Sequence, residues 1–260
     1  ELLQFLDGVI ARETAHTLKD TWVMVSHDRQ PIEPMQALQA TMPFNTFYAR
    51  HKYPWLLSDL QPHIQMHYQP IVDFGQSGKV FGFEALCRLK TPEGKWLNGM
   101  EAFALAAEVK RTHELDLACQ HMALIGKSQP ISADKPIFIN VLPQTIMSPG
   151  WLDFILQTMA QHAIDKREVV IEIVESEKTS PELLARYCDE IRMHGLRIAL
   201  DDMGSGFNGL RILAEVRADF IKIDRAIVHE AQGSRVRTEL LEAIISMAQR
   251  LGCTIIAEGL

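Results

Sequence analysis

From about residue 64 onward, short apolar runs rich in β-branched residues alternate with amphipathic stretches. The apolar runs predict strands at 65–72, 79–88, 137–141, 169–174, 196–201, 219–223 and 254–258. The stretches between them predict helices at 101–110, 113–127, 144–161, 181–194, 208–216 and 235–251. Alternation of this kind is typical of parallel strands joined by helices. Because no Gly-x-Gly-x-x-Gly follows the first strand, the pattern favours a (β/α) barrel over an open doubly wound sheet.

Residues 1–60 follow a different pattern. The apolar residues of 2–10 repeat with helical spacing, whereas Pro31, Pro34 and Pro43 would interrupt any long element. We therefore predict two parts. A mainly helical N-terminal segment of unknown role covers 1–60, and the barrel domain covers 61–260.

The composition excludes several classes of protein. Hydrophobic residues make up 47% of the 260 residues, too many for a disordered chain. The net charge of −7 argues against a protein that binds a DNA or RNA polymer, or an acidic membrane, by electrostatic attraction. No apolar run approaches the roughly 20 residues of a membrane span. The four cysteines form no zinc-binding pattern, so we expect free thiols and a reducing, cytoplasmic location.

Polar side chains fall at or near the ends of the predicted strands. They are Glu84, Asn140, Glu172, Glu175, Asp201, Asp202, Lys222 and Glu258. Most intervals between them are close to one βα unit, so each unit would carry its polar group to the rim where barrel active sites form. A single buried acid usually has an arginine partner or caps a backbone. Several acids and an amide on one rim, however, need more counter-charge than one lysine supplies.

Oxygen-rich ligand sets of this kind suit Mg²⁺ or Mn²⁺ rather than zinc. Adjacent Asp201 and Asp202 could serve two metal ions, and two-metal sites commonly hydrolyse phosphate esters. The residues alone therefore predict a metal-dependent hydrolase of phosphate esters. The glycines of the following loop, 202–207, favour an anion site or a mobile rim loop, although glycine pairs also make plain tight turns.

A series of short motifs runs through the same region in a fixed order. It comprises Tyr68-Gln69-Pro70-Ile71-Val72, Glu84-Ala85-Leu86 with Arg88, Ile139-Asn140-Val141, Glu172-Ile173-Val174-Glu175, Asp201-Asp202-Met203-Gly204-Ser205-Gly206, Asp219-Phe220-Ile221-Lys222-Ile223-Asp224 and Ala257-Glu258-Gly259. The series resembles the EAL domain, the bacterial cyclic di-GMP phosphodiesterase family, over about residues 64–260. The resemblance implies a modified TIM-like (β/α)8 barrel whose first strand is antiparallel to the others. It also implies hydrolysis of cyclic di-GMP to linear pGpG.

The resemblance also implies roles for individual residues. The metal ligands would be Glu84, Asn140, Glu172, Asp201 and Asp202, with Asp201 bridging two Mg²⁺ or Mn²⁺ ions. Lys222 would hold the attacking water, Glu258 would orient it or accept its proton, and Glu175 would anchor the glycine-rich loop. The substrate contacts would be Gln69, Leu86, Arg88 and Asp224.

The sequence departs from the family pattern in three places. Val174 stands where the family has Thr, which removes a hydroxyl but no metal ligand. Met203 and Ser205 stand where the family has Phe and Thr, which would alter the loop that couples dimerisation to activity. The family also continues past Ala257-Glu258-Gly259 with a helix and an eighth strand, whereas this sequence ends at Leu260. We therefore expect a barrel that lacks its closing strand in this chain.

The resemblance leaves alternatives open. The leading expectation is an active phosphodiesterase that forms a homodimer, with a possible upstream sensory or GGDEF domain and a cytoplasmic location, alone or as the cytoplasmic part of a membrane-anchored protein. The alternative is a catalytically silent domain that acts as a cyclic di-GMP receptor or docks another protein. A third possibility is a different metal phosphoesterase on the same barrel. The retained ligand residues favour the enzyme.

Overall fold

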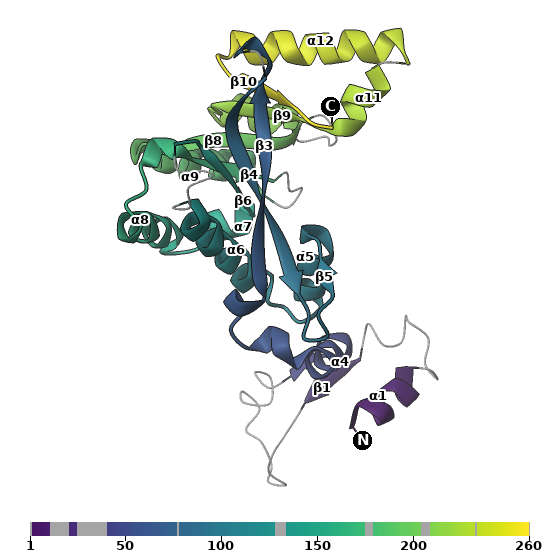
Figure 1. Ribbon diagram of the computed structural model, residues 1–260. Helices are drawn as coiled ribbons and strands as arrows, with labels where there is room; N and C mark the ends of the chain where they lie inside the picture. The colour runs from purple at the N-terminus through teal and green to yellow at the C-terminus, as the bar shows by residue number, and fades with distance from the viewer. Residues whose placement is uncertain are drawn as a thin grey trace. The chain divides into compact units, whose positions relative to one another are not determined.

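The computed structural model describes residues 2–10, 21–24, 41–76, 78–127, 134–174, 179–203, 209–231 and 233–259 (Figure 1). The chain forms two compact units. The first comprises Glu1–Ile64 and Arg88–Leu115, and the second comprises Gln65–Cys87 and Asp116–Leu260. None of the helices in the described ranges is both long and apolar enough to span a membrane.

The first unit combines short helices with short strands. Helices α1 (Leu2–Ile10) and α4 (Phe44–Lys52) pack through Leu6, Phe44 and Phe47, next to an antiparallel ladder of β1 (Trp22–Met24) and β2 (Thr41–Pro43). The unit also contains the 3₁₀ turns η1 (Pro54–Leu57) and η2 (Gln61–His63), strand β5 (Trp96–Leu97) and helix α5 (Gly99–Glu108). A capping box between Asn98 and Glu101 starts α5.

The second unit is built on one sheet with the strand order β10-β9-β8-β7-β6-β4-β3. Its strands are β3 (Ile64–Asp73), β4 (Lys79–Lys90), β6 (Ile137–Val141), β7 (Val169–Ile173), β8 (Arg197–Met203), β9 (Phe220–Ile223) and β10 (Thr254–Ala257). Neighbouring strands from β4 to β10 pair in parallel. Only 74–78 connect β3 to β4, too few residues for a parallel crossover, so β3 runs antiparallel as predicted.

In the described part of the chain, β3 and β10 form the two edges of this sheet. The sheet is therefore a TIM-like (β/α) barrel without a closing strand, which confirms the predicted fold class. The helices of this unit are α6 (Thr112–Lys127), α7 (Pro143–Ile146), α8 (Trp151–Gln161), α9 (Pro181–Met193), α10 (Gly209–Glu215), α11 (Arg225–Ala231) and α12 (Arg235–Arg250). Figure 1 shows α8 and α9 lying alongside the central strands.

The central strands β7 and β9 are buried on both faces, and each face of the sheet has its own core. On the outer face, residues such as Ile139, Ile171 and Ile198 pack against Ile155 and Leu184 of the covering helices. The inner face carries a separate cluster, formed by Phe138, Val170, Ala199 and Phe220. Side chains alternate between the faces along a strand, so residues two positions further along point inward as well.

The predicted strands of the barrel are all present, with ends that differ by a few residues. One predicted helix is wrong in detail, because 144–161 is divided into α7 and α8. Pro149 and Gly150 lie at the break, and Gly150 adopts a left-handed φ of 78°, which an α-helix cannot accommodate. The pattern also missed β5 and the helix α11 that follows Asp224.

Candidate active site

Several of the polar residues singled out in the sequence continue the inner face of the barrel. Asn140, Glu172, Asp201 and Lys222 lie two positions after the inward residues Phe138, Val170, Ala199 and Phe220, respectively. Asn140 is the register partner of Glu172 across β6 and β7. The strands are parallel, so this layer of polar side chains collects at their carboxyl ends, as predicted.

Lys222 lies at the centre of this polar layer. Its Nζ is 2.5 Å from Glu172 Oε1, 2.7 Å from Glu258 Oε1 and 3.1 Å from both Glu84 Oε2 and Asp201 Oδ1. Asn140 Nδ2 donates to Glu84 Oε1 at 3.1 Å. The structure therefore brings together Glu84, Asn140, Glu172, Asp201, Lys222 and Glu258 from six different strands or strand ends.

Burial raises the free-energy cost of holding charged groups in this cluster. The side chains of Lys222 and Glu172 are only 2% and 0% exposed. Burial disfavours the charge on Lys222, but the carboxylates of Glu172, Asp201 and Glu84 outweigh it and raise the pKa of the ammonium. Burial also raises the pKa of Glu172 well above its usual value, although Lys222 opposes the effect. The pKa of Glu258 is raised by burial as well, again against the pull of Lys222.

The cluster has spare acceptor capacity. Glu172 Oε2 and Asp201 Oδ1 are buried and accept no hydrogen bond from any described residue. Asp201 Oδ1 lies within ion-pair distance of Nζ, but not in hydrogen-bond geometry. Unsatisfied buried carboxylate oxygens next to an amide are the donors that a hard divalent cation prefers.

The present arrangement of the acids is centred on the ammonium of Lys222. Within the described ranges, no three His, Cys, Asp or Glu side chains are arranged so that they could hold a metal ion without moving. The donor chemistry of Glu84, Asn140, Glu172 and Asp201 nevertheless fits Mg²⁺ or Mn²⁺. Rotation of these side chains away from Nζ is what metal binding would require.

The acids open onto a cleft of about 620 Å³. Glu84, Asp201, Lys222 and Glu258 lie in its wall, together with two predicted substrate contacts, Gln69 and Leu86. Apolar side chains of β3 and β10 form much of the remaining wall, including Ile71, Val72, Ile255 and Ile256. Phe74, at the start of the turn after β3, also lines the cleft with 77% of its side chain exposed. The cleft is large enough for part of a nucleotide.

The other predicted site residues in the described ranges are not among the residues that line the cleft. Asp224 follows β9, and its Oδ1 accepts a hydrogen bond from the N–H of Ala226 at 2.7 Å, so it caps the start of α11. Arg88 is half-buried near the end of β4 and belongs to the first unit. Asp202 lies in β8, but its side chain is outside the described residues, as are Glu175 and the glycine-rich loop 204–208.

Strand β8 is irregular where the two consecutive acids Asp201 and Asp202 lie. Its register against β9 shifts between Leu200 and Met203. Such irregularities are common beside active sites. Asp201, two positions after the inward Ala199, is the acid whose carboxylate lies beside Lys222.

Sequence analysis missed Arg225, which lines the cleft from the first turn of α11. The available signal was its place directly after Asp224, at the carboxyl end of a predicted strand. It also missed the apolar wall formed by β10, because a strand at a sheet edge reads like any other strand in the sequence.

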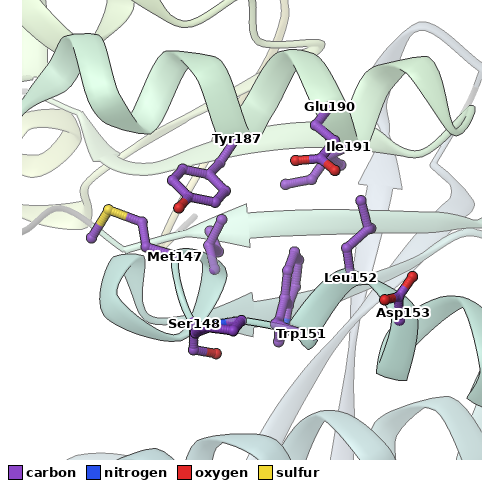
Figure 2. A pocket seen from close by; sticks show the side chains of 11 residues that line it. Met147, Ser148, Trp151, Leu152, Asp153, Tyr187, Glu190 and Ile191 are labelled. Carbon is purple, nitrogen blue, oxygen red and sulfur yellow. The ribbon is translucent and has the colours of Figure 1, made fainter.

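A second cavity of about 330 Å³ lies among α7, α8 and α9 (Figure 2). Its wall includes Trp151, Leu152, Tyr187 and Ile191, with the acids Asp153 and Glu190 also present. A hydrogen bond holds the ring of Trp151 in place, since its Nε1 donates to Gln120 Oε1 at 2.7 Å. None of the inward-facing strand acids lines this cavity, whereas Glu84, Asp201 and Glu258 line the 620 Å³ cleft, which is therefore the candidate site.

Comparison with known proteins agrees with the series of motifs and with the fold. The family model for the EAL domain matches residues 56–260, which is most of the chain. The chain belongs to the EAL domain family. Among its relatives is PdeG of Escherichia coli K12, named a probable cyclic di-GMP phosphodiesterase, with 30% identity over 198 residues. The match covers 74% of this chain but only 38% of PdeG, so this EAL chain spans well under half the length of that relative.

Solved EAL structures share the fold. The PaMucR phosphodiesterase in its c-di-GMP complex superimposes with a TM-score of 0.70 at 22% identity, covering 82% of this chain and 86% of that one. Klebsiella pneumoniae BlrP1, solved as a calcium and cy-diGMP complex, gives a TM-score of 0.67 at 21% identity, covering 100% and 59%. At these identities the likeness establishes the fold.

Proposed function

We propose that this EAL domain hydrolyses one phosphodiester bond of cyclic di-GMP, yielding linear pGpG, with Mg²⁺ or Mn²⁺ as cofactor. The observation that carries the proposal is the gathering of four carboxylates around the buried Lys222, with two buried carboxylate oxygens unsatisfied. Relatives named as cyclic di-GMP phosphodiesterases support the choice of substrate.

The metal-binding residues in this proposal are Glu84, Asn140, Glu172, Asp201 and Asp202. Bound divalent ions would activate water and stabilise the charge on the phosphate and the leaving oxygen. The chain itself supplies the register that sets Asn140 opposite Glu172 across β6 and β7, and it buries Glu172 fully. Glu175, together with the loop after β8, stays a predicted anchor for Asp202.

Lys222 and Glu258 are the proposed groups for handling water. The ammonium of Lys222 can donate to a water oxygen and hold it beside the scissile phosphate. Glu258 Oε1 lies 2.7 Å from Nζ and is the most exposed of the four acids, at 29% of its side chain, so it can reach the same water. Its raised pKa makes it a better proton acceptor than an ordinary glutamate. The water oxygen adds to phosphorus, the P–O3′ bond breaks, and the proton is passed on to the leaving oxygen.

The cleft supports binding of a nucleotide beside the acids, because it has a volume of about 620 Å³ and the acids lie in its wall. Gln69 and Leu86 are proposed to contact the substrate from β3 and β4, and Arg88 and Asp224 stay predicted contacts. A homodimer, an upstream sensory or GGDEF domain and a cytoplasmic location remain part of the proposal. They draw on the resemblance to the family.

The decisive test is to incubate the chain with cyclic di-GMP and Mg²⁺ or Mn²⁺ and to follow pGpG by chromatography. Glu84→Gln removes one charge at constant size, and we expect it to lower turnover by more than about 100-fold while the circular dichroism spectrum stays unchanged. Glu242→Gln, the same change at an exposed position of α12, is the control and should keep full activity. Nucleotide binding without product in either metal would contradict the enzyme and leave the silent receptor.

A further inference from the structure

Arg225 is a cation in the cleft to which no role has been assigned. It follows Asp224 at the end of β9, begins α11, and lines the cleft together with Lys222 and Glu258. Its side chain is exposed, and its guanidinium forms no hydrogen bond or ion pair within the part of the chain that the structure describes. An arginine with all of its donors available in a nucleotide-sized cleft is a candidate for ligand binding.

Gly259 leaves the space that the side chain of Arg225 occupies along the cleft. It has a left-handed φ of 73°, and a Cβ built on it would overlap Arg225 Cγ and lie 2.6 Å from Cδ and 2.9 Å from Cβ. The aliphatic stem of Arg225 therefore runs across the bare backbone of Gly259. Any larger residue at this position would push the stem away.

The end of β10 is held in place beside α11 (Figure 1). Glu258 N–H donates to the carbonyl of Ile223 at 3.1 Å, and the Gly259 carbonyl lies 3.1 Å from His229 Nε2. These two contacts fix Gly259 against the helix that carries Arg225. The stem of Arg225 thus rests on a backbone segment that is itself anchored.

The charges that line the cleft favour a contact between Arg225 and a phosphate of the ligand. Among the described residues that line the cleft, Lys222 and Arg225 are the cations, and Glu84, Asp201 and Glu258 are the anions. Lys222 is 1% exposed and surrounded by carboxylates, so it cannot neutralise a charge further out. Three anions against Lys222 alone leave these residues with a net charge of −2, and Arg225 brings it to −1, so Arg225 halves the negative charge that a dinucleotide with two phosphates would meet in this wall.

We propose that Arg225 binds a phosphodiester oxygen of the cyclic dinucleotide, and that Gly259 is the positioning residue that directs it there. The inference rests on the proposed substrate. A guanidinium presents two parallel N–H groups that match two phosphate oxygens, which suits the phosphate better than a single donor would. The binding contact is separate from the metal-binding carboxylates, so it can be measured without turnover.

The test measures the affinity of the full chain for cyclic di-GMP by calorimetry, with Ca²⁺ as the divalent ion and with turnover followed in parallel in Mg²⁺. Arg225→Gln should weaken binding by about 10- to 100-fold. Arg217→Gln is the matched control, because Arg217 is exposed just before β9 whereas Arg225 follows the same strand. It makes the same change of net charge outside the cleft and should leave the affinity unchanged.

Gly259→Ala should weaken binding as well, and Gly252→Ala is its control. Gly252 has a similar φ of 78°, but a Cβ there would meet nothing within 4 Å. In the Arg225→Gln background, Gly259→Ala should have no further effect on affinity. An undiminished effect in that background would overturn the positioning role.

The outcomes separate this inference from the proposed function. Suppose that the wild-type chain binds cyclic di-GMP without turnover and that Arg225→Gln binds it more weakly. This result supports the phosphate contact and contradicts the enzyme. Normal turnover with unchanged affinity in Arg225→Gln overturns the contact and leaves the enzyme. Salt dependence identifies the contacted group, since losing a phosphate contact makes the affinity less sensitive to ionic strength. An unchanged salt dependence with weaker binding would assign Arg225 to a neutral base edge, and no binding by the wild type would overturn the inference.

Discussion

Lys222 holds its ammonium 2.5–3.1 Å from four carboxylates, in a place where 2% of its side chain is exposed. An ammonium has three N–H donors, so it cannot make a good hydrogen bond to all four acids at once. The unsatisfied oxygens of Glu172 and Asp201 follow from this shortage. The same shortage leaves these carboxylates able to accept a further cation.

Replacing Lys222 tests this balance directly. In Lys222→Met, the buried Glu172 and its neighbours would repel each other without a compensating charge. We expect a loss of about 3–5 kcal/mol in the free energy of unfolding, the usual cost of breaking a buried ion pair from one side. Urea unfolding at neutral pH in a chelating buffer measures the change.

Lys127 provides the control for this prediction. It is as buried as Lys222 and pairs with Glu168 at 2.9 Å, away from the acidic cluster. Lys127→Met should also destabilise the chain, but its acidic cluster is intact, so Mg²⁺ should stabilise it no more than the unmodified chain. Lys222→Met should gain more stability from Mg²⁺ than either of them. Equal responses of the two variants to Mg²⁺ would show that the carboxylates do not act as a group.

At the scale of the elements, strand β3 and helix α6 approach each other closely at Tyr68 and Gly126. Gly126, near the end of α6, leaves room for the half-buried ring of Tyr68, and a Cβ on Gly126 would overlap the hydroxyl and lie 2.8 Å from Cζ. Tyr68 precedes Gln69, a proposed substrate contact. The packing of this edge strand therefore bears on the wall of the cleft.

Gly126→Ala should lower the free energy of unfolding, by about 1–2 kcal/mol. The alanine gains up to about 1 kcal/mol of helix propensity, but the displaced ring costs about 1–3 kcal/mol. In a Tyr68→Leu background the clash disappears, so the same substitution should become neutral or stabilising. Denaturant unfolding of the four variants gives the coupling energy, and a value near zero would contradict the contact.

The strands show which features of the site could be predicted from the sequence. The spacing of the polar residues predicted that Asn140, Glu172 and Lys222 would meet at one rim, because each βα unit carries its polar group to the carboxyl end of its strand. The contact of Arg225 with Gly259 could not be predicted in this way. It joins residues 34 positions apart whose meeting depends on how α11 packs beside the end of β10.

At the scale of the whole chain, part of the net charge of −7 comes from acids that lie close together in the cluster around Lys222. Four of the acids lie together in the cluster, with Lys222 as their close counter-charge. The cluster should thus attract divalent cations more strongly than the surface charges do, because buried charges are less screened by salt. Stability of the folded chain should then depend on the metal.

Binding of Mg²⁺ or Mn²⁺ should raise the melting temperature of the chain. An ion at roughly 100 times its dissociation constant adds about 2.7 kcal/mol to the folded state, which for a chain of this size corresponds to about 5–10 °C. Calorimetric or fluorescence melting in Mn²⁺, compared with NaCl of equal ionic strength and with excess chelator, measures the shift. The double variant Glu84→Gln with Asp201→Asn should lose most of it, because both substitutions remove carboxylate donors from the cluster. An equal shift in that variant, or in NaCl alone, would mean that the ion binds elsewhere on the acidic chain.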